Sequence, residues 1–143
     1  MKRTILVTLA ALCMASLLPS EACTNLIVGK NASADGSVIC SYNADSFGFI
    51  SPLSIYLPGA HQEGEMLAIR GFFGPGAEHL IAQAPYTYGV AGLMNEKQVT
   101  IVETTWGGRS ELRNPEGWLG YYNLMELALQ RATTAREAIA VIH

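Results

Sequence analysis

The segment CTNLIVGKNASADGSVICSYN, from Cys23 to Asn43, decides the fold of this chain. Two stretches rich in apolar and β-branched residues, 24–29 and 37–43, flank a polar turn at 31–36. The turn contains Asp35-Gly36, and Asp-Gly between such stretches is a strong hairpin signal. The sequence therefore predicts a β-hairpin whose first strand begins next to a cysteine.

The register of this hairpin bears on whether its two cysteines can meet. With a turn centred near Ser33, we expect Cys23 to lie opposite Asn43. In the same register Cys40 lies opposite Leu26. The two cysteines are then on different faces, which argues against a disulfide, and a shift by one residue would undo the inference.

Residues 1–22 have the pattern of a secretory signal peptide. Lys2 and Arg3 give a positive start, an uncharged apolar stretch follows, and the small residue Ala22 precedes the expected cleavage point. Cleavage there makes Cys23 the first residue of an exported chain, whether periplasmic, on the cell surface or secreted.

An N-terminal cysteine carries a thiol and a primary α-amine on one residue. The amine can accept the thiol proton, so that a single residue supplies both nucleophile and base. Reference pKa values of about 7.7–8.0 for an α-amine and about 8.5 for a thiol are close enough for this transfer near neutral pH. Cys23 is therefore the candidate catalytic nucleophile.

Three other interpretations of Cys23 stay open at this point. It could be the lipidated first residue of a bacterial lipoprotein, although Glu21 in the penultimate position argues against that signal. It could form a disulfide with Cys40 in an oxidising compartment, or be an ordinary buried thiol. Because lipidation would block the sulfur, a lipid-anchored, non-catalytic binding protein is the rival from another function class.

Composition argues against several kinds of partner. The chain has 143 residues and a net charge of −3, which becomes −4 when Lys2, Arg3 and Glu21 leave with the signal. It has no basic run for nucleic acid, and no uncharged apolar stretch outside the expected signal peptide approaches membrane-spanning length. His61 and His79 lie apart without ligand spacing, so no metal site is expected. No glycine-rich loop has the context of a phosphate site, and no cofactor is expected.

Beyond the hairpin, strand patterns come first and helical patterns last. Strands are expected over 52–57, 66–72, 87–93 and 98–104, with turns at 61–65 and 94–97 and an ambiguous stretch at 73–84. A helix is expected over 118–132, and Thr134 with Glu137 has capping-box spacing at the start of a second helix. Strands followed by helices predict an α+β fold, with helices packed on a largely antiparallel sheet.

The segment Cys23–Ser37 resembles the mature N-terminus of the dipeptidase A-like cysteine peptidases. It shares their Cys-Thr, apolar strand, Gly-Lys, Ala-Ser and Asp-Gly-Ser at matching spacing. Later similarities are Asp45-Ser46, Asn95-Glu96, Glu103-Thr104-Thr105 and the helical stretch 124–136. These peptidases are N-terminal-nucleophile hydrolases, related to bile-salt hydrolases and penicillin V acylases.

The resemblance implies an exported cysteine dipeptidase that hydrolyses short peptides, with an amidase acting on non-peptide acyl-amides as the alternative. It also implies a four-layer αββα sandwich in proteins several times longer than this chain. The pattern at 134–143 lacks a helix stop signal. We therefore expect residues 23–143 to be the N-terminal portion of the hydrolase domain, and to be inactive by themselves.

Four further residues are candidates for substrate binding or oxyanion stabilisation. Asp45 could bind the α-ammonium of the substrate, and Asn95 could donate to the tetrahedral oxyanion. Thr104 and Thr105 are weaker candidates, because threonine at a strand end is usually structural. Tyr42 departs from the family, since many relatives carry Arg three residues before the Asp, and this suggests different thiolate stabilisation or substrate recognition.

Overall fold

The computed structural model describes residues 23–45, 52–70, 77–104 and 108–143. The expected signal peptide, Ser46 and Thr105 lie outside these residues. The elements, in chain order, are β1 (Thr24–Val28), β2 (Ile39–Asn43), β3 (Ile55–Tyr56), β4 (Gly59–Ala60), β5 (Met66–Arg70), β6 (Glu78–Ala82), β7 (Tyr86–Thr87), β8 (Val90–Ala91), β9 (Met94–Asn95), the 3-10 turn η1 (Ser110–Leu112), α2 (Tyr121–Arg131) and α3 (Ala135–Ile142).

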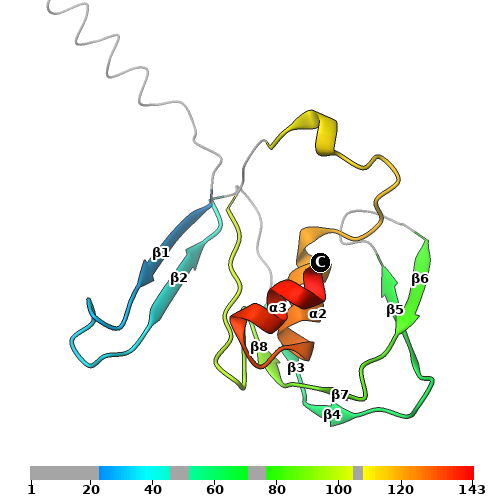
Figure 1. The fold of residues 1–143 in the computed structure, drawn as a ribbon, viewed down its shortest axis with the longest axis horizontal. Helices are drawn as coiled ribbons and strands as arrows, with labels where there is room; N and C mark the ends of the chain where they lie inside the picture. The colour runs from blue at the N-terminus through cyan, green and yellow to red at the C-terminus, as the bar shows by residue number, and fades with distance from the viewer. Residues whose placement is uncertain (1–22, 46–51, 71–76, 105–107) are drawn as a thin grey trace, which may run out of the picture.

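The strands form small antiparallel sheets, and the two helices follow them (Figure 1). The pairings are β1 with β2, β3 with β8 and β9, β4 with β7, and β5 with β6. The stretch 73–84, which the sequence left ambiguous, supplies β6. The expected α+β class with antiparallel strands is confirmed, as several small sheets followed by two helices.

The predicted hairpin is present, but its register differs by one residue. Thr24 pairs with Asn43, and Ile27 pairs with Cys40. The loop contains a local turn that begins at Gly29 and a second one in which the Asp35 carboxylate accepts from a backbone N–H, so the loop is centred after Ser33. The inference of different faces was therefore wrong.

Cys23 and Cys40 lie toward the same face of the hairpin, and their separation along the strand keeps them apart. Four strand positions correspond to about 13 Å, well beyond the reach of a disulfide. No disulfide joins the two thiols. The conclusion about the disulfide thus stands on distance along the strand rather than on opposite faces.

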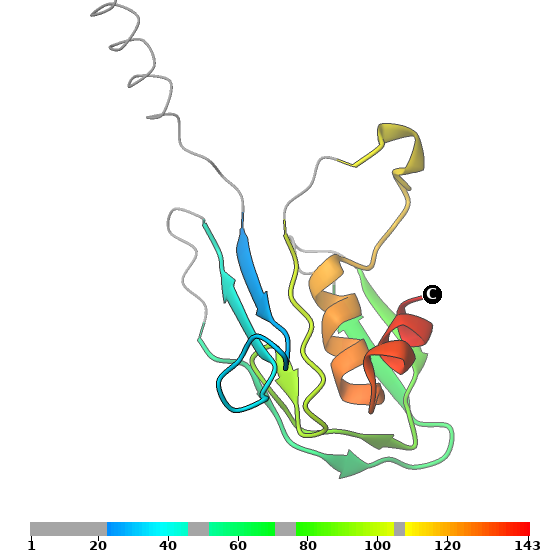
Figure 2. The same ribbon diagram turned by 60° about the vertical axis from the view of Figure 1, so that its left-hand side comes forward.

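The expected strands at 87–93 and 98–104 are also corrected. Val90–Ala91 and Met94–Asn95 form a short hairpin around Gly92, whose φ of 59° suits glycine. A second turn follows at Asn95–Gln98, and only an isolated bridge between Met94 and Thr100 continues the pairing. Residues 101–104 are not part of a strand and instead run beside β1 (Figure 2).

The core lies where the helices cover the β8–β9 hairpin. Its buried members are Val90, Val99, Ala128, Leu129, Ala132 and Ala138. The predicted cap of α3 is present, because Thr134 Oγ1 accepts from the N–H of Glu137 at 3.2 Å. The Glu137 carboxylate reaches back to Thr133, where it accepts from the backbone N–H and the hydroxyl.

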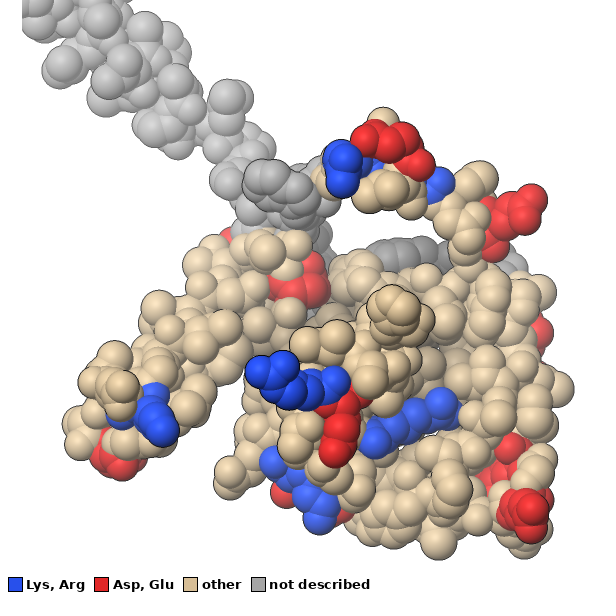
Figure 3. Space-filling model, viewed as in Figure 1, with Lys and Arg blue, Asp and Glu red and all other residues tan. Residues whose placement is uncertain are grey.

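The β1–β2 hairpin projects away from this core. Its apolar side chains are largely exposed, Leu26 at 60% and Ile27 at 68%, and neutral residues cover most of it in the space-filling view (Figure 3). Polar contacts tie the base of the hairpin to residues 103 and 104. The base of the hairpin is therefore where the N-terminal strand meets the rest of the chain.

Candidate active site

The thiol of Cys23 lies in a cluster with one carboxylate and one phenol. Cys23 Sγ donates to Glu103 Oε1 at 3.2 Å. The Tyr42 hydroxyl donates to the same oxygen at 2.8 Å and lies 3.6 Å from Sγ. The candidate nucleophile is therefore held in place through Glu103, a residue 80 positions later in the chain.

Strand alternation and two backbone contacts bring these groups together. Tyr42 pairs with Asn25 across the hairpin, and Asn25 shares a face with Cys23 because side chains alternate along a strand. Asn25 Nδ2 donates to the carbonyl of Glu103 at 2.6 Å. Thr104 Oγ1 donates to the carbonyl of Cys23 at 2.9 Å. These bonds fix residues 103 and 104 against the first strand.

The phenol of Tyr42 acts as a donor in this cluster. Burial raises its pKa above the ordinary value of 10.0, and its hydrogen bonds with Glu103 and Cys23 raise it further. Tyr121 lies close by, and burial and the neighbouring Tyr122 raise its pKa. Both phenols therefore remain protonated at neutral pH.

Asp45 lies at the same end of the hairpin as Cys23. Its Oδ2 accepts from Thr24 Oγ1 at 2.9 Å, and its Oδ1 accepts from Asn43 Nδ2. Its side chain is partly exposed. The carboxylate is thus fixed beside the residue that follows Cys23, with one side open to solvent.

Asn95 has a different setting, between the β9 turn and the end of α2. It is 3% exposed, and Nδ2 donates to the carbonyls of Leu129 and Ala132, each at 2.7 Å. Its Oδ1 accepts from the N–H groups of Lys97 and Val99. All of its ordinary hydrogen-bonding capacity is used on backbone, so an oxyanion would have to displace one of these bonds.

Of the predicted site residues, the structure brings Thr104 and Asp45 near Cys23 and places Asn95 elsewhere. Thr105 lies outside the described residues. The sequence placed Glu103 at the end of the expected strand 98–104 and did not predict its contact with the thiol. The sequence feature that could have indicated a role for Glu103 was its position immediately before Thr104 in the Glu-Thr-Thr segment.

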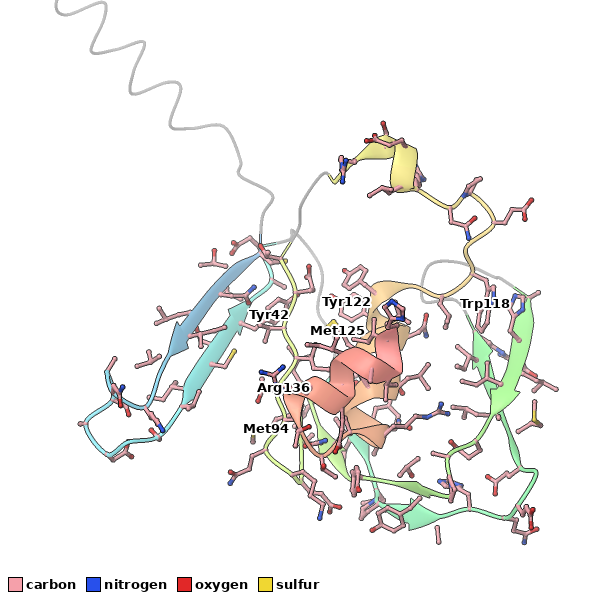
Figure 4. The ribbon with its side chains drawn as sticks, in the orientation of Figure 1. Tyr42, Met94, Trp118, Tyr122, Met125 and Arg136 are labelled. Carbon is pink, nitrogen blue, oxygen red and sulfur yellow. The ribbon has the colours of Figure 1, made fainter. Side chains whose placement is uncertain are left out.

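A cavity of about 420 Å³ adjoins the thiol cluster on the side of Tyr42. Figure 4 shows Tyr42 on β2 facing Tyr122 and Met125 of α2, and all three line the cavity. The other lining residues are Pro52, Leu53, Ser54, Tyr56, Val90, Gly92, Leu93, Glu126 and Leu129. Tyr42 is therefore shared between the thiol cluster and a mostly apolar cavity.

Among the described residues, no group of three His, Cys, Asp or Glu side chains is arranged to hold a metal ion. In the same parts of the chain, no helix is both long and apolar enough to cross a membrane.

Residues 22–63 match the model of peptidase family C69. This match spans the hairpin, Cys23 and Asp45, and it supports the resemblance to dipeptidase A-like cysteine peptidases and a cysteine-type peptidase function. Comparisons with curated proteins and with solved structures found no significant match.

Proposed function

We propose that this protein is an exported cysteine dipeptidase that hydrolyses short peptides. Removal of residues 1–22 would activate it, because Cys23 gains its α-amine only when the preceding peptide bond is cut. The match to peptidase family C69 supports peptidase chemistry. The observation that carries the site is the contact of Cys23 Sγ with Glu103 Oε1 at 3.2 Å, with Tyr42 on the same oxygen.

The proposed reaction begins with transfer of the Cys23 thiol proton to its α-amine. The sulfur attacks the peptide carbonyl, and the resulting ammonium gives a proton to the leaving amine as the C–N bond breaks. Water then attacks the thioester, with the α-amine as base, and the C–S bond breaks. The acid product leaves and the thiol is restored.

The surrounding residues have supporting roles in this proposal. Thr104 holds the carbonyl of Cys23 at 2.9 Å and thereby orients the residue that carries both nucleophile and base. Asp45 supplies a partly exposed carboxylate, held by the hydroxyl of Thr24, the residue that follows Cys23. This carboxylate is suited to bind the α-ammonium of a dipeptide. We also propose that the β-sheets and helices are part of the αββα sandwich that the resemblance implies.

Turnover by the full-length exported protein tests the proposal. We expect hydrolysis of dipeptides, with kcat/KM reduced by about 10³-fold or more in Cys23→Ala. Cys40→Ala is the matched control, because Cys40 lies four strand positions away from Cys23 on the same hairpin, and it should retain activity. If acyl-amides are hydrolysed and no dipeptide is cleaved, the substrates are acyl-amides rather than dipeptides. Activity that survives Cys23→Ala would overturn the proposal.

A further inference from the structure

The cavity beside Tyr42 suggests what the site selects. Its walls are mostly apolar, with Leu53, Val90, Leu93 and Met125 among them. Tyr42 lines the cavity, while its hydroxyl lies 3.6 Å from Cys23 Sγ. One side chain thus spans from the nucleophile to the cavity.

We propose that this cavity is the subsite for one substrate side chain, that of the residue whose carbonyl the sulfur attacks. The cavity selects large apolar side chains at that residue. The inference rests on the proposed peptidase function and adds its specificity. A substrate whose carbonyl contacts Sγ carries the side chain beside that carbonyl close to Tyr42, which lines the cavity. The volume of about 420 Å³ is within the usual range for ligand pockets and exceeds what one large side chain needs.

The charges at the cavity favour neutral side chains over acidic ones. Glu126 lines the cavity, and its carboxylate is engaged by Gln130 Nε2 at 3.5 Å and by the hydroxyl of Tyr56. No Lys or Arg is among the described residues that line it. An acidic substrate side chain would therefore enter near a carboxylate without a compensating cation.

Tyr42 itself contributes to this neutrality. Its side chain lines the cavity with an aromatic group, and its raised pKa keeps the phenol uncharged. We expect the preference for apolar side chains to follow from this uncharged wall.

The test is a dipeptide panel hydrolysed by the full-length exported protein and two variants. In the panel, the residue whose carbonyl is attacked is Leu, Phe, Gly, Asp or Lys, and the second residue is kept constant. Leu53→Trp narrows the cavity at a side chain that is 69% exposed, so it leaves the core intact. Leu80→Trp is the matched control, since Leu80 is 61% exposed and lies on β6 outside the cavity.

We expect wild-type kcat/KM for the Leu and Phe substrates to exceed that for Gly and Asp by about 10- to 200-fold. Leu53→Trp should lower it at least 10-fold for Phe and leave the Gly substrate within about twofold, while Leu80→Trp changes neither. The proposed subsite alone would be overturned by any of three results: cleavage without this preference, a preference for Lys, or an equal loss of kcat/KM on all substrates in Leu53→Trp. Absence of any peptide cleavage would overturn the proposed function as well.

Discussion

Tyr42 and Glu103 are joined by a hydrogen bond of 2.8 Å, and the oxygen that accepts it also accepts from the thiol of Cys23. A hairpin residue and a residue that follows the β8–β9 hairpin thus fix the candidate nucleophile together. The carboxylate of Glu103 would also balance the positive charge of the α-ammonium that forms when the Cys23 amine takes the thiol proton.

The first prediction concerns Glu103 as a positioning residue. Glu103→Gln keeps an acceptor but removes the charge, which lowers each hydrogen bond from about 1.5–3 kcal/mol to about 0.5–1.5 kcal/mol, and a loss of about 1.4 kcal/mol in the transition state is tenfold in rate. We expect kcat to fall by at least 10-fold with little change in KM, as steady-state kinetics would measure.

Glu96→Gln is the control for this change, because Glu96 lies at the surface beside Lys97. It should leave both constants unchanged. An unaltered kcat in Glu103→Gln would contradict the positioning role, whereas a rise in KM alone would assign Glu103 to substrate binding.

The second prediction concerns the α-amine as base. A mature chain with one extra alanine before Cys23, verified by intact mass, keeps the thiol but moves the amine to another residue. We expect kcat/KM to fall by about 10²–10⁴-fold, the usual contribution of a positioned general base. Undiminished turnover by the extended chain would assign the base to another group.

The third prediction separates two roles for Asn95. Asn95→Ala would leave two buried carbonyls at the end of α2, those of Leu129 and Ala132, and two backbone N–H groups without the Asn95 side chain as partner. We expect a loss of about 3 kcal/mol in the free energy of unfolding, measured by denaturant titration, because each unsatisfied buried group costs about 1–3 kcal/mol. A stable Asn95→Ala protein without turnover would instead support Asn95 as the oxyanion donor.

The fourth prediction concerns pH and Glu137. Hydrogen bonds from the Thr133 side chain and backbone hold its pKa below the ordinary value of 4.5. The contribution of the Glu137 carboxylate to stability is therefore present above about pH 4.5. It is lost as pH falls through the lower pKa of Glu137 in the folded state. Glu137→Gln should lower Tm at pH 7, and the difference from the wild type should be smaller at pH 3. An equal difference at both pH values would rule out this ionic contribution.

Local patterns predicted the parts of the fold that local interactions determine. The Asp35-Gly36 turn predicted the hairpin, and Thr134 predicted the cap of α3. The register was missed because two successive turns in one loop move its centre by half a residue, and this changes every pairing. The contact of Glu103 with Cys23 was not predicted because it spans 80 residues, beyond what any local pattern specifies.

Asn95 shows why the role of a site residue is hard to predict from sequence. An Asn in a turn has the same sequence signature whether its amide faces a substrate or the backbone. The structure assigns the amide to the carbonyls at the end of α2. That assignment depends on packing between segments that are more than 30 residues apart in the chain.

Intact-mass and N-terminal analysis of the full-length exported protein, with brief iodoacetamide treatment at neutral pH, tests the central claim most directly. The account predicts a chain that begins at Cys23, carries no lipid and is alkylated rapidly at that residue. A lipid attached to Cys23, or cleavage at another position, would remove the proposed base or nucleophile and contradict the account.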